Sequence, residues 1–483
     1  MIDLHDVLAT SAGGHPVRQR RLYEQLRAAI LVGRLLPGAV LPSTRELARE
    51  QGMARNTVIH AYEQLAAEGY VQSSRQGTVV TVQAAVRQGA ERRTTASGLA
   101  AARHQLLSQR TRHCSRRRTP EDDLRPLMPG VPALDAFPLK IWRRLCERAD
   151  RSASPGDLSY RYAVGEPELR QAIATYLRAS RGVRCHADQV IVTDGTQHSL
   201  SLCAQLLADP GELAWIEHPG YGGARTALSQ AGLRLRPITV DAQGIHPPAH
   251  WWHQHPPRLI YTTPSHQYPL GSVLSLERRL ALIEGARRQG AWILEDDYDS
   301  EFRHDGPPLA AMQGLVDDAP VVYLGTFSKS MFPGLRLGFV VMPAALADQA
   351  VGAVGELDRR GHAALQRALA AFIDEGHFTS HLRKMRKLYL VRQQALREAL
   401  QAHWPAPSQV LGGSCGMHLT LSLPTELDDQ TLAQRAFAAG LSPRPLSVYG
   451  TGGITGFNGL VMGYANTPAE SMDTHVRTLA SCV

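Results

Sequence analysis

One lysine lies where a nucleophilic amine could act. The chain has four lysines among its 52 basic residues, so it uses arginine almost everywhere else. Lys329 stands in GTFSKSMFPGLRLGF, directly after an apolar stretch. A lysine amine can form an imine with an aldehyde, whereas a guanidinium cannot. The alternative is a solvated surface charge, so the neighbouring motifs must decide.

Three other motifs also follow apolar stretches. Residues 195–197 (Gly-Thr-Gln) come after VIVTD and open a helix, whose free N–H groups suit a phosphate. Asp296 and Tyr298 come after AWILE, where acids can be caps, metal ligands or partners of a protonated ring nitrogen. Tyr221 follows LAWIEHPG and can cover a flat ligand or belong to the core. Together with Lys329, these parts are what a pyridoxal 5'-phosphate site requires.

The elements that carry these motifs indicate an α/β fold. From Leu127 onward, short apolar strands alternate with amphipathic helical stretches. Such alternation predicts a largely parallel sheet that is covered on both faces. In these folds ligands lie at the carboxyl ends of the strands, where the motifs stand. The expected strands are 189–193, 213–218, 258–263, 291–296, 321–326 and 337–342.

Residues 19–83 predict a different, smaller fold. Leu22, Leu26 and Ile30 recur every fourth residue and make one apolar stripe of a first helix. Ser43 and Glu46 have capping-box spacing at the start of a second helix. A third helix is expected over about 55–68, followed by a hairpin that turns at 76–77. This order is typical of a winged helix-turn-helix.

The predicted third helix begins with residue types that read base edges and phosphates in the major groove. A polar helix face without a partner is the alternative, but the whole arrangement favours DNA. Two further residues fall at the predicted wing tip, Arg75 and Gly77. The candidate contacts on the helix are Arg55, Asn56, Thr57 and His60.

Charge and composition divide the chain into three parts. We expect a DNA-binding domain over 1–83, a basic flexible linker over 84–126 and an effector domain over 127–483. The linker holds ten Arg against four acids, whereas residues 127–483 are neutral. A self-repelling tether is expected, and whether its arginines touch DNA stays open.

The remaining bulk features exclude several protein classes. No apolar run approaches the length of about 18 residues that a membrane span needs. The N-terminus does not have the pattern of a signal peptide. Six scattered cysteines suggest neither a disulfide framework nor a metal site. We therefore expect a cytoplasmic protein.

Motifs in two parts of the chain resemble known families. LPSTRELA, RNTVIHAYEQLAAEGYV and RQGTVV resemble the GntR-type DNA-binding domain, except that Ala54 stands where that family usually has Ser. YRYAVGEPELRQAIATYL, DGTQHSL, HPGYGGAR, TPSHQYPLG, EDDYDSEFR and the Lys329 motif resemble the fold-type I, aminotransferase-like pyridoxal phosphate domain, with a smaller C-terminal α+β subdomain. The whole chain resembles the MocR-type (GabR-like) transcriptional regulators.

The resemblance implies a role for each matching residue. Lys329 would form the internal aldimine, Asp296 would pair with the pyridine nitrogen, Tyr298 would bond the ring hydroxyl and Tyr221 would stack on the ring. Tyr160 would reach the phosphate of the partner subunit in a head-to-tail homodimer. The implied phosphate ligands are Gly195, Thr196, Gln197, Thr326, Ser328 and Arg336. The implied contacts to a double-stranded DNA operator are Ser43, Arg45, Arg55, Asn56 and Thr57.

Two departures from working aminotransferases favour a regulator over an enzyme. Tyr268 replaces the Asn that contacts the ring, and Val461 stands where an Arg clamps the substrate carboxylate. The Arg used by γ-aminobutyrate-sensing relatives falls near Val448, although Arg225 or Arg444 can substitute. We expect a sensor of a small amine, an amino acid or pyridoxal phosphate itself. The alternative is an active aminotransferase with an attached DNA-binding domain.

Overall fold

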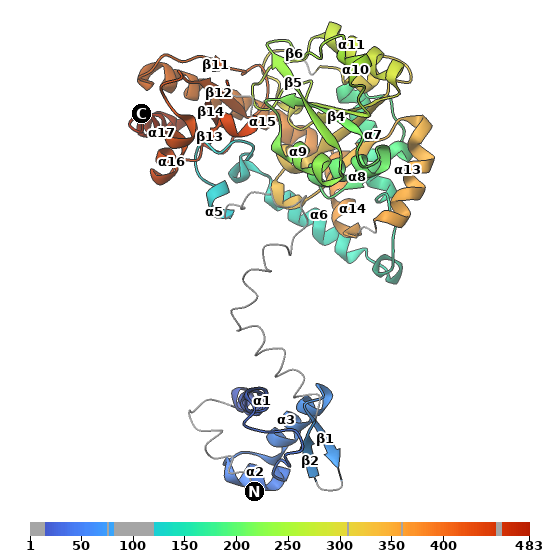
Figure 1. Cartoon of the computed structure of the whole chain (residues 1–483), viewed down its shortest axis with the longest axis vertical. Helices are drawn as coiled ribbons and strands as arrows, with labels where there is room; N and C mark the ends of the chain where they lie inside the picture. Colours follow the sequence, from blue (N-terminus) through green and yellow to red (C-terminus); the bar gives the residue numbers. More distant parts are fainter. Residues whose placement is uncertain (1–14, 75–76, 82–119, 307–308, 359–360, 451–455) are drawn as a thin grey trace. The chain divides into compact units, whose positions relative to one another are not determined.

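A computed structural model describes residues 15–74, 77–81, 120–306, 309–358, 361–450 and 456–483 (Figure 1). The chain forms two compact units, residues 1–108 and 109–483. We call them the N-terminal unit and the C-terminal unit. Their boundary falls inside the predicted linker, most of which lies outside the described residues.

The N-terminal unit is the predicted winged helix-turn-helix. It consists of α1 (His15–Val32), α2 (Thr44–Glu50), α3 (Arg55–Ala67), β1 (Val71–Ser74) and β2 (Gly77–Val80). The two strands pair antiparallel, with Val71 opposite Val80. The predicted apolar stripe of α1 is buried and packs with Val58 and Leu65 of α3. Burial of these side chains fixes the angle at which α3 is presented.

The two helix starts of this unit differ in their caps. The Ser43 hydroxyl accepts a hydrogen bond from the N–H of Glu46 at 3.2 Å, which confirms the predicted N-cap of α2. Ala54 occupies the N-cap of α3 and offers no side-chain bond. One N–H of the first turn of α3 therefore lacks the usual side-chain partner.

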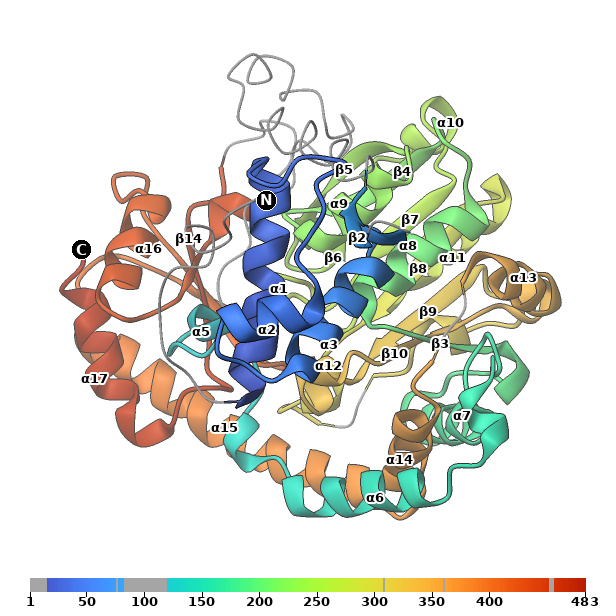
Figure 2. The ribbon, with the colours of Figure 1, turned by 90° about the horizontal axis from the view of Figure 1, so that it is seen from below.

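An eight-stranded sheet forms the centre of the C-terminal unit. Strands β9, β8, β7, β4 and β5 run parallel, whereas β10 is antiparallel to both of its neighbours and β6 is antiparallel to β5. Figure 2 shows the strands from β4 to β3 side by side. In spatial order the strands are β3 (Val190–Thr193), β10 (Gly338–Val341), β9 (Val321–Thr326), β8 (Trp292–Asp297), β7 (Leu259–Thr262), β4 (Leu213–His218), β5 (Arg234–Asp241) and β6 (Gly244–Ile245). The six predicted strands are confirmed.

Helices cover both faces of this sheet because successive side chains of a strand point to opposite faces. Ile293 and Leu294 are adjacent on β8, yet they belong to different buried clusters. The first face packs against α7 (Pro167–Arg181), α11 (Leu276–Gln289) and α14 (Ala363–Asp374). The second face packs against α8 (Thr196–Leu207), α9 (Gly222–Gln230) and α13 (Ala344–Leu357). This is the predicted doubly covered α/β sheet.

The predicted smaller C-terminal subdomain is also present. Its antiparallel sheet has the order β11 (Val410–Leu411), β12 (His418–Ser422), β14 (Gly459–Gly463) and β13 (Arg444–Pro445). The long helix α15 (His377–His403) leads into it, and α16 (Asp429–Ala438) and α17 (Ala469–Ala480) complete it. The other helices of the unit are α5 (Pro120–Asp123), α6 (Leu139–Arg151), α10 (Trp251–Gln254) and α12 (Phe327–Ser330). Within the described ranges, no helix has the length and apolar character needed to cross a bilayer.

Candidate functional site

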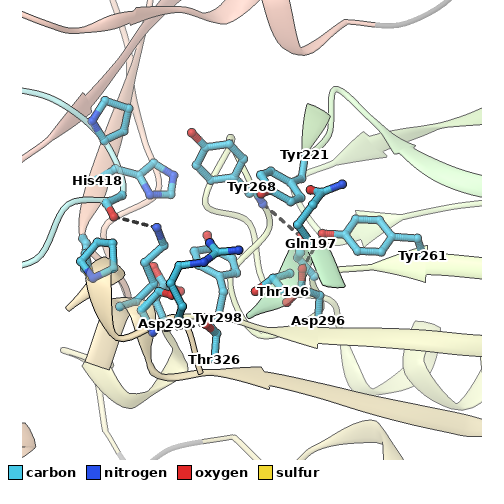
Figure 3. A pocket seen from close by; sticks show the side chains of 18 residues that line it. Thr196, Gln197, Tyr221, Tyr261, Tyr268, Asp296, Tyr298, Asp299, Thr326 and His418 are labelled. Atoms are coloured by element: carbon cyan, nitrogen blue, oxygen red, sulfur yellow. Dashed lines mark hydrogen bonds between the residues drawn. The ribbon is translucent and has the colours of Figure 1, made fainter. Parts of the chain in front are cut away.

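A cavity of about 300 Å³ lies at the carboxyl ends of the parallel strands (Figure 3). Most of the predicted site residues line it: Thr196, Gln197, Tyr221, Asp296, Tyr298, Thr326, Ser328, Lys329 and Arg336. Residues of the C-terminal subdomain, among them Met417 and His418, line it as well. The parallel topology thus collects motifs that are widely separated in the sequence.

Lys329 reaches this cavity from the short helix α12. Strand β9 ends at Thr326, whose hydroxyl accepts a hydrogen bond from the N–H of Ser328 at 3.2 Å and caps α12. The Nζ of Lys329 donates to the carbonyl oxygen of Gly130 at 2.7 Å. The amine is therefore partly buried and held at the cavity wall rather than solvated at the surface.

Strand alternation decides which acid of the Glu-Asp-Asp run faces the cavity. Glu295 accepts hydrogen bonds from the N–H groups of Met312 and Gln313, and Asp297 pairs with the buried Arg181 at 2.6 Å. Asp296 lies between them and points to the opposite side of the sheet, into the cavity. The structure therefore places the ring-nitrogen candidate in the cavity and gives its two neighbours structural partners.

The two carboxylate oxygens of Asp296 differ in their hydrogen bonding. Its Oδ2 accepts a hydrogen bond from the Tyr261 hydroxyl at 2.8 Å. Its Oδ1 is buried and has no hydrogen-bond partner among the described residues. Burial raises the pKa of Asp296 to about 7. A donor such as a protonated ring nitrogen would satisfy this oxygen and stabilise the charged carboxylate.

A helix start and an arginine at the cavity suit a phosphate. Gly195 is the N-cap of α8 with φ +94°, a conformation that favours glycine, and Thr196 and Gln197 begin the helix. The side chain of Gln197 donates to the carbonyl oxygen of Gly223 at 3.1 Å, and the backbone N–H of Gln197 belongs to the first turn of α8. The Arg336 guanidinium lies beside Gly195, because a Cβ built on that glycine would be 3.8 Å from Nη1. A helix N-terminus with a guanidinium is a typical anion site.

A buried network behind Tyr298 was not predicted from the sequence. The Nδ1 of His266 lies 3.0 Å from both carboxylate oxygens of Asp299 and 3.0 Å from the Tyr298 hydroxyl. Because a carboxylate only accepts, Nδ1 carries the proton, and the Tyr298 oxygen accepts on that side. The Tyr298 proton is then free to be donated into the cavity. Gly416 (φ +87°) permits this packing, since a Cβ there would overlap His266 and Asp299.

Cys415 joins the same buried group. Ligand atoms of His266, Asp299 and Cys415 lie within 4.8 Å of one another. The sequence prediction found no such group, because the three residues are far apart along the chain. The Sγ of Cys415 already points to the carbonyl oxygen of Asp299 at 3.8 Å. We interpret the group as packing that holds Tyr298.

Aromatic rings form much of the remaining wall. Tyr221 lines the cavity as the N-cap residue of α9, and burial raises its pKa to about 12. Its ring meets Tyr268 edge-on with centroids 6.1 Å apart. The hydroxyls of Tyr268 and Tyr449 lie 2.8 Å apart and join the large sheet to the C-terminal subdomain.

The residues proposed to grip a carboxylate do not line the cavity. Arg225 donates from Nη1 to the carbonyl oxygen of Gly450 at 2.7 Å, and Arg444 lies on β13. Val461 is buried in β14, and Val448 is 46% exposed. Tyr160 is 82% exposed and also lies outside this cavity, so its role toward a partner subunit stays a prediction.

The candidate DNA contacts occupy the exposed starts of α2 and α3. Ser43, Arg45, Arg55, Asn56 and His60 are exposed, and Thr57 is half-buried. The Nε of Arg55 lies 3.4 Å from the hydroxyl of Thr44, which links the two helix starts. On the wing, Gly77 is exposed and starts β2, whereas Arg75 lies outside the described residues.

Comparison with known proteins identifies relatives of both units. Residues 18–80 match bacterial regulatory proteins of the gntR family, and residues 133–455 match aminotransferase class I and II. The chain is 40% identical to the probable rhizopine catabolism regulatory protein MocR of Rhizobium meliloti, over 96% of this chain and 93% of that protein. It is 33% identical to the HTH-type transcriptional regulator TauR of Rhodobacter capsulatus, over 90% of each chain.

A solved structure resembles the C-terminal unit. It is LysN, the alpha-aminoadipate aminotransferase of Thermus thermophilus, complexed with N-(5'-phosphopyridoxyl)-L-leucine. The TM-score is 0.66 at 26% identity, and the match covers 74% of this chain and 92% of that chain.

Proposed function

The chain belongs to the MocR-type transcriptional regulators, in which a GntR-family DNA-binding domain precedes an aminotransferase-like domain, and we propose that it senses a small amine through pyridoxal 5'-phosphate. The observation that carries this proposal is that two suitable groups line the same cavity. Lys329 offers a primary amine, and Asp296 offers a buried oxygen that lacks a partner among the described residues.

The residues around the cavity fit that cofactor. When bound, pyridoxal 5'-phosphate supplies an aldehyde that condenses with primary amines. The N-terminus of α8 and Arg336 would hold the phosphate, and Asp296 would keep the ring nitrogen protonated. Tyr298, oriented by His266, would donate its proton to the ring hydroxyl. Tyr221 would cover one face of the ring.

The N-terminal unit provides the output. The exposed start of α3 would enter the major groove, with Arg55 and Asn56 on base edges and Ser43 and Arg45 on the backbone. An effector that binds the two states of the C-terminal unit with different affinity would change how the chain holds its operator. The regulator would act in the cytoplasm, where operator DNA is found.

We propose a head-to-tail homodimer as the working assembly. Leu158 and Tyr160 are 87% and 82% exposed, and Tyr162 next to them is also exposed. A run of exposed apolar side chains is typical of a protein interface. Tyr160 of each subunit would then reach the phosphate of its partner.

An active aminotransferase is the second candidate. The cavity retains Lys329, Asp296 and Arg336, which such an enzyme requires. Against turnover, no arginine beyond Arg336 lines the cavity in the described part of the chain. Cofactor that is converted by an amino acid and regenerated by a keto acid over many cycles would establish the enzyme. A single conversion without recycling fits the sensor.

Reduction of the loaded protein tests the cofactor site. Borohydride treatment of the full chain with pyridoxal 5'-phosphate, followed by peptide mass spectrometry, should place one pyridoxyl group on Lys329. Lys140 is exposed on α6 and serves as the internal control. A label spread over both lysines, or found on neither, contradicts the proposal.

A further inference from the structure

Apart from Asp296, Asp299, Lys329 and Arg336, the described lining of the cavity is uncharged. We propose that the effector is a primary amine that carries hydroxyl groups and no carboxylate. This inference rests on the proposed function, since it concerns the ligand of the same cavity. It follows from the side chains that line the cavity and from those that do not.

The described lining of the cavity contains two cations, Lys329 and Arg336. Both are assigned above, one to the aldehyde and one to the phosphate of the cofactor. Within the described lining, an effector carboxylate therefore finds no cation beyond these two.

The two arginines considered above as substitutes for a carboxylate grip, Arg225 and Arg444, do not line the cavity. Arg225 is bonded to the carbonyl oxygen of Gly450, as described above. Arg444 is close enough for its charge to act on the Tyr268 phenol, yet it does not line the cavity. A grip on a carboxylate would require one of these two side chains to move.

The wall presents hydroxyl and imidazole groups instead. We call Tyr268 and His418, which both line the cavity, the neutral wall. The paired hydroxyls of Tyr268 and Tyr449 share one hydrogen bond, and a hydroxyl can donate one bond and accept two. Tyr268 can therefore still bond an effector hydroxyl while its bond to Tyr449 is kept.

His418 completes the neutral wall. Its Nε2 lies 3.1 Å from the carbonyl oxygen of Pro269, which can only accept, so Nε2 carries the proton. Complete burial lowers the pKa of His418 well below its usual value and keeps the ring neutral. Its Nδ1 is then an acceptor. Figure 3 shows the ring of Tyr268 between Tyr221 and His418. The ring centroids of Tyr268 and His418 are 5.1 Å apart.

This set of groups discriminates between two kinds of amine. A hydroxyl can both donate and accept against such a wall, so its hydrogen bonds are replaced when water leaves. A carboxylate brings a full charge that neutral groups compensate poorly once it is buried. The geometry thus favours an amino alcohol or other polyhydroxylated amine over an amino acid of the same length.

Matched ligands test the inference on the full chain loaded with pyridoxal 5'-phosphate. Visible absorbance of the bound cofactor is titrated with 4-amino-1-butanol, 4-aminobutyrate and butylamine, and with serinol against serine. We expect each amino alcohol to have an apparent Kd at least about tenfold below that of its acid. We also expect 4-amino-1-butanol to bind more tightly than butylamine. An acid that binds as tightly as its alcohol overturns the inference.

Variants locate the preference. Tyr268→Phe should remove the advantage of the amino alcohol over butylamine, whereas the same change at Tyr70 in the N-terminal unit should leave both constants unchanged. If Tyr268→Phe does not retain cofactor, His418→Phe removes the other polar group of the neutral wall and provides the comparison. Tight binding of an acid that Arg444→Ala abolishes would reveal a moving arginine and overturn the inference.

The outcomes separate this inference from the proposed function. A response to amino acids alone contradicts the hydroxylated class but keeps amine sensing. A loaded protein whose spectrum responds to none of these amines contradicts both.

Discussion

The two units use basic side chains in opposite ways. In the N-terminal unit, arginines such as Arg45 and Arg55 stand exposed at helix starts, where a fixed charge can meet phosphates and base edges. In the C-terminal unit, Lys329 is partly buried, bonded to a carbonyl oxygen and faces a buried carboxylate. Under the proposed function, one site would work through surface charge, and the other through chemistry that only an amine performs. This difference would explain why a chain so rich in arginine keeps lysine at this position.

The largest effect should come from Lys329→Arg, which keeps the charge but removes the nucleophile. We expect complete loss of the borohydride-fixed pyridoxyl group, because a guanidinium does not condense with the aldehyde. The exposed Lys140→Arg is the matched control and should label normally. Labelling that survives in Lys329→Arg would contradict the assignment of Lys329.

Asp296 should make the cofactor-free protein sensitive to pH. Its pKa is 3.8 in its ordinary state and about 7 in the fold, because burial disfavours the charged form. The folded state then binds more protons than the unfolded state between these values, so stability falls as the pH rises from about 4 to 7. For this one group the loss is on the order of 4 kcal/mol.

Thermal unfolding of cofactor-free wild type and Asp296→Asn measures this effect. The Tm of the wild type should fall more steeply with rising pH than the Tm of the variant. Burial also raises the pKa values of Glu295 and Glu301 to about 7, and these two groups contribute equally to both curves. Asp305→Asn, at an exposed position, should follow the wild type. Parallel curves for wild type and Asp296→Asn would show that burial does not raise the pKa of Asp296.

The contrast between the units also marks the limit of sequence reasoning. Periodicity predicted the helices, the wing and the six strands, because apolar spacing reports burial directly. Four strand ends indicated the cavity, since parallel topology brings such ends together. The His266–Asp299 network behind Tyr298 could not be predicted, because no local spacing links residues from a loop, a strand end and Gly416. The pairing of Tyr268 with Tyr449 across two subdomains is a tertiary contact of the same kind.

A smaller effect is expected for Arg55→Ala in the N-terminal unit. If Arg55 reads a base, its loss should weaken binding to a duplex selected from a random pool by about 1–3 kcal/mol and relax the sequence preference at one position. Arg20→Ala is the control, since Arg20 is exposed on α1 and pairs with Glu24 at 2.9 Å. Fluorescence anisotropy at fixed salt measures both. Equal losses in the two variants would indicate general charge attraction only.

The smallest expected effect is a gain in the stability of helix α3. Ala54→Ser supplies the hydroxyl that the N-cap of α3 lacks and should stabilise the helix start by about 1 kcal/mol. Hydrogen exchange of the 55–67 segment in the full chain should slow by about fivefold. The same change at Ala67, at the other end of the helix, should not slow exchange. Slowing in both variants would argue against a capping effect.

The central claim is that an effector acts on DNA binding through the cofactor held by Lys329. The most direct test is the affinity of the cofactor-loaded full chain for its selected duplex, measured with and without 4-amino-1-butanol in wild type and in Lys329→Ala. We predict that the amine changes the Kd of the wild type and leaves that of Lys329→Ala unchanged. An equal change in both proteins would contradict the account, because the amine would then act without Lys329.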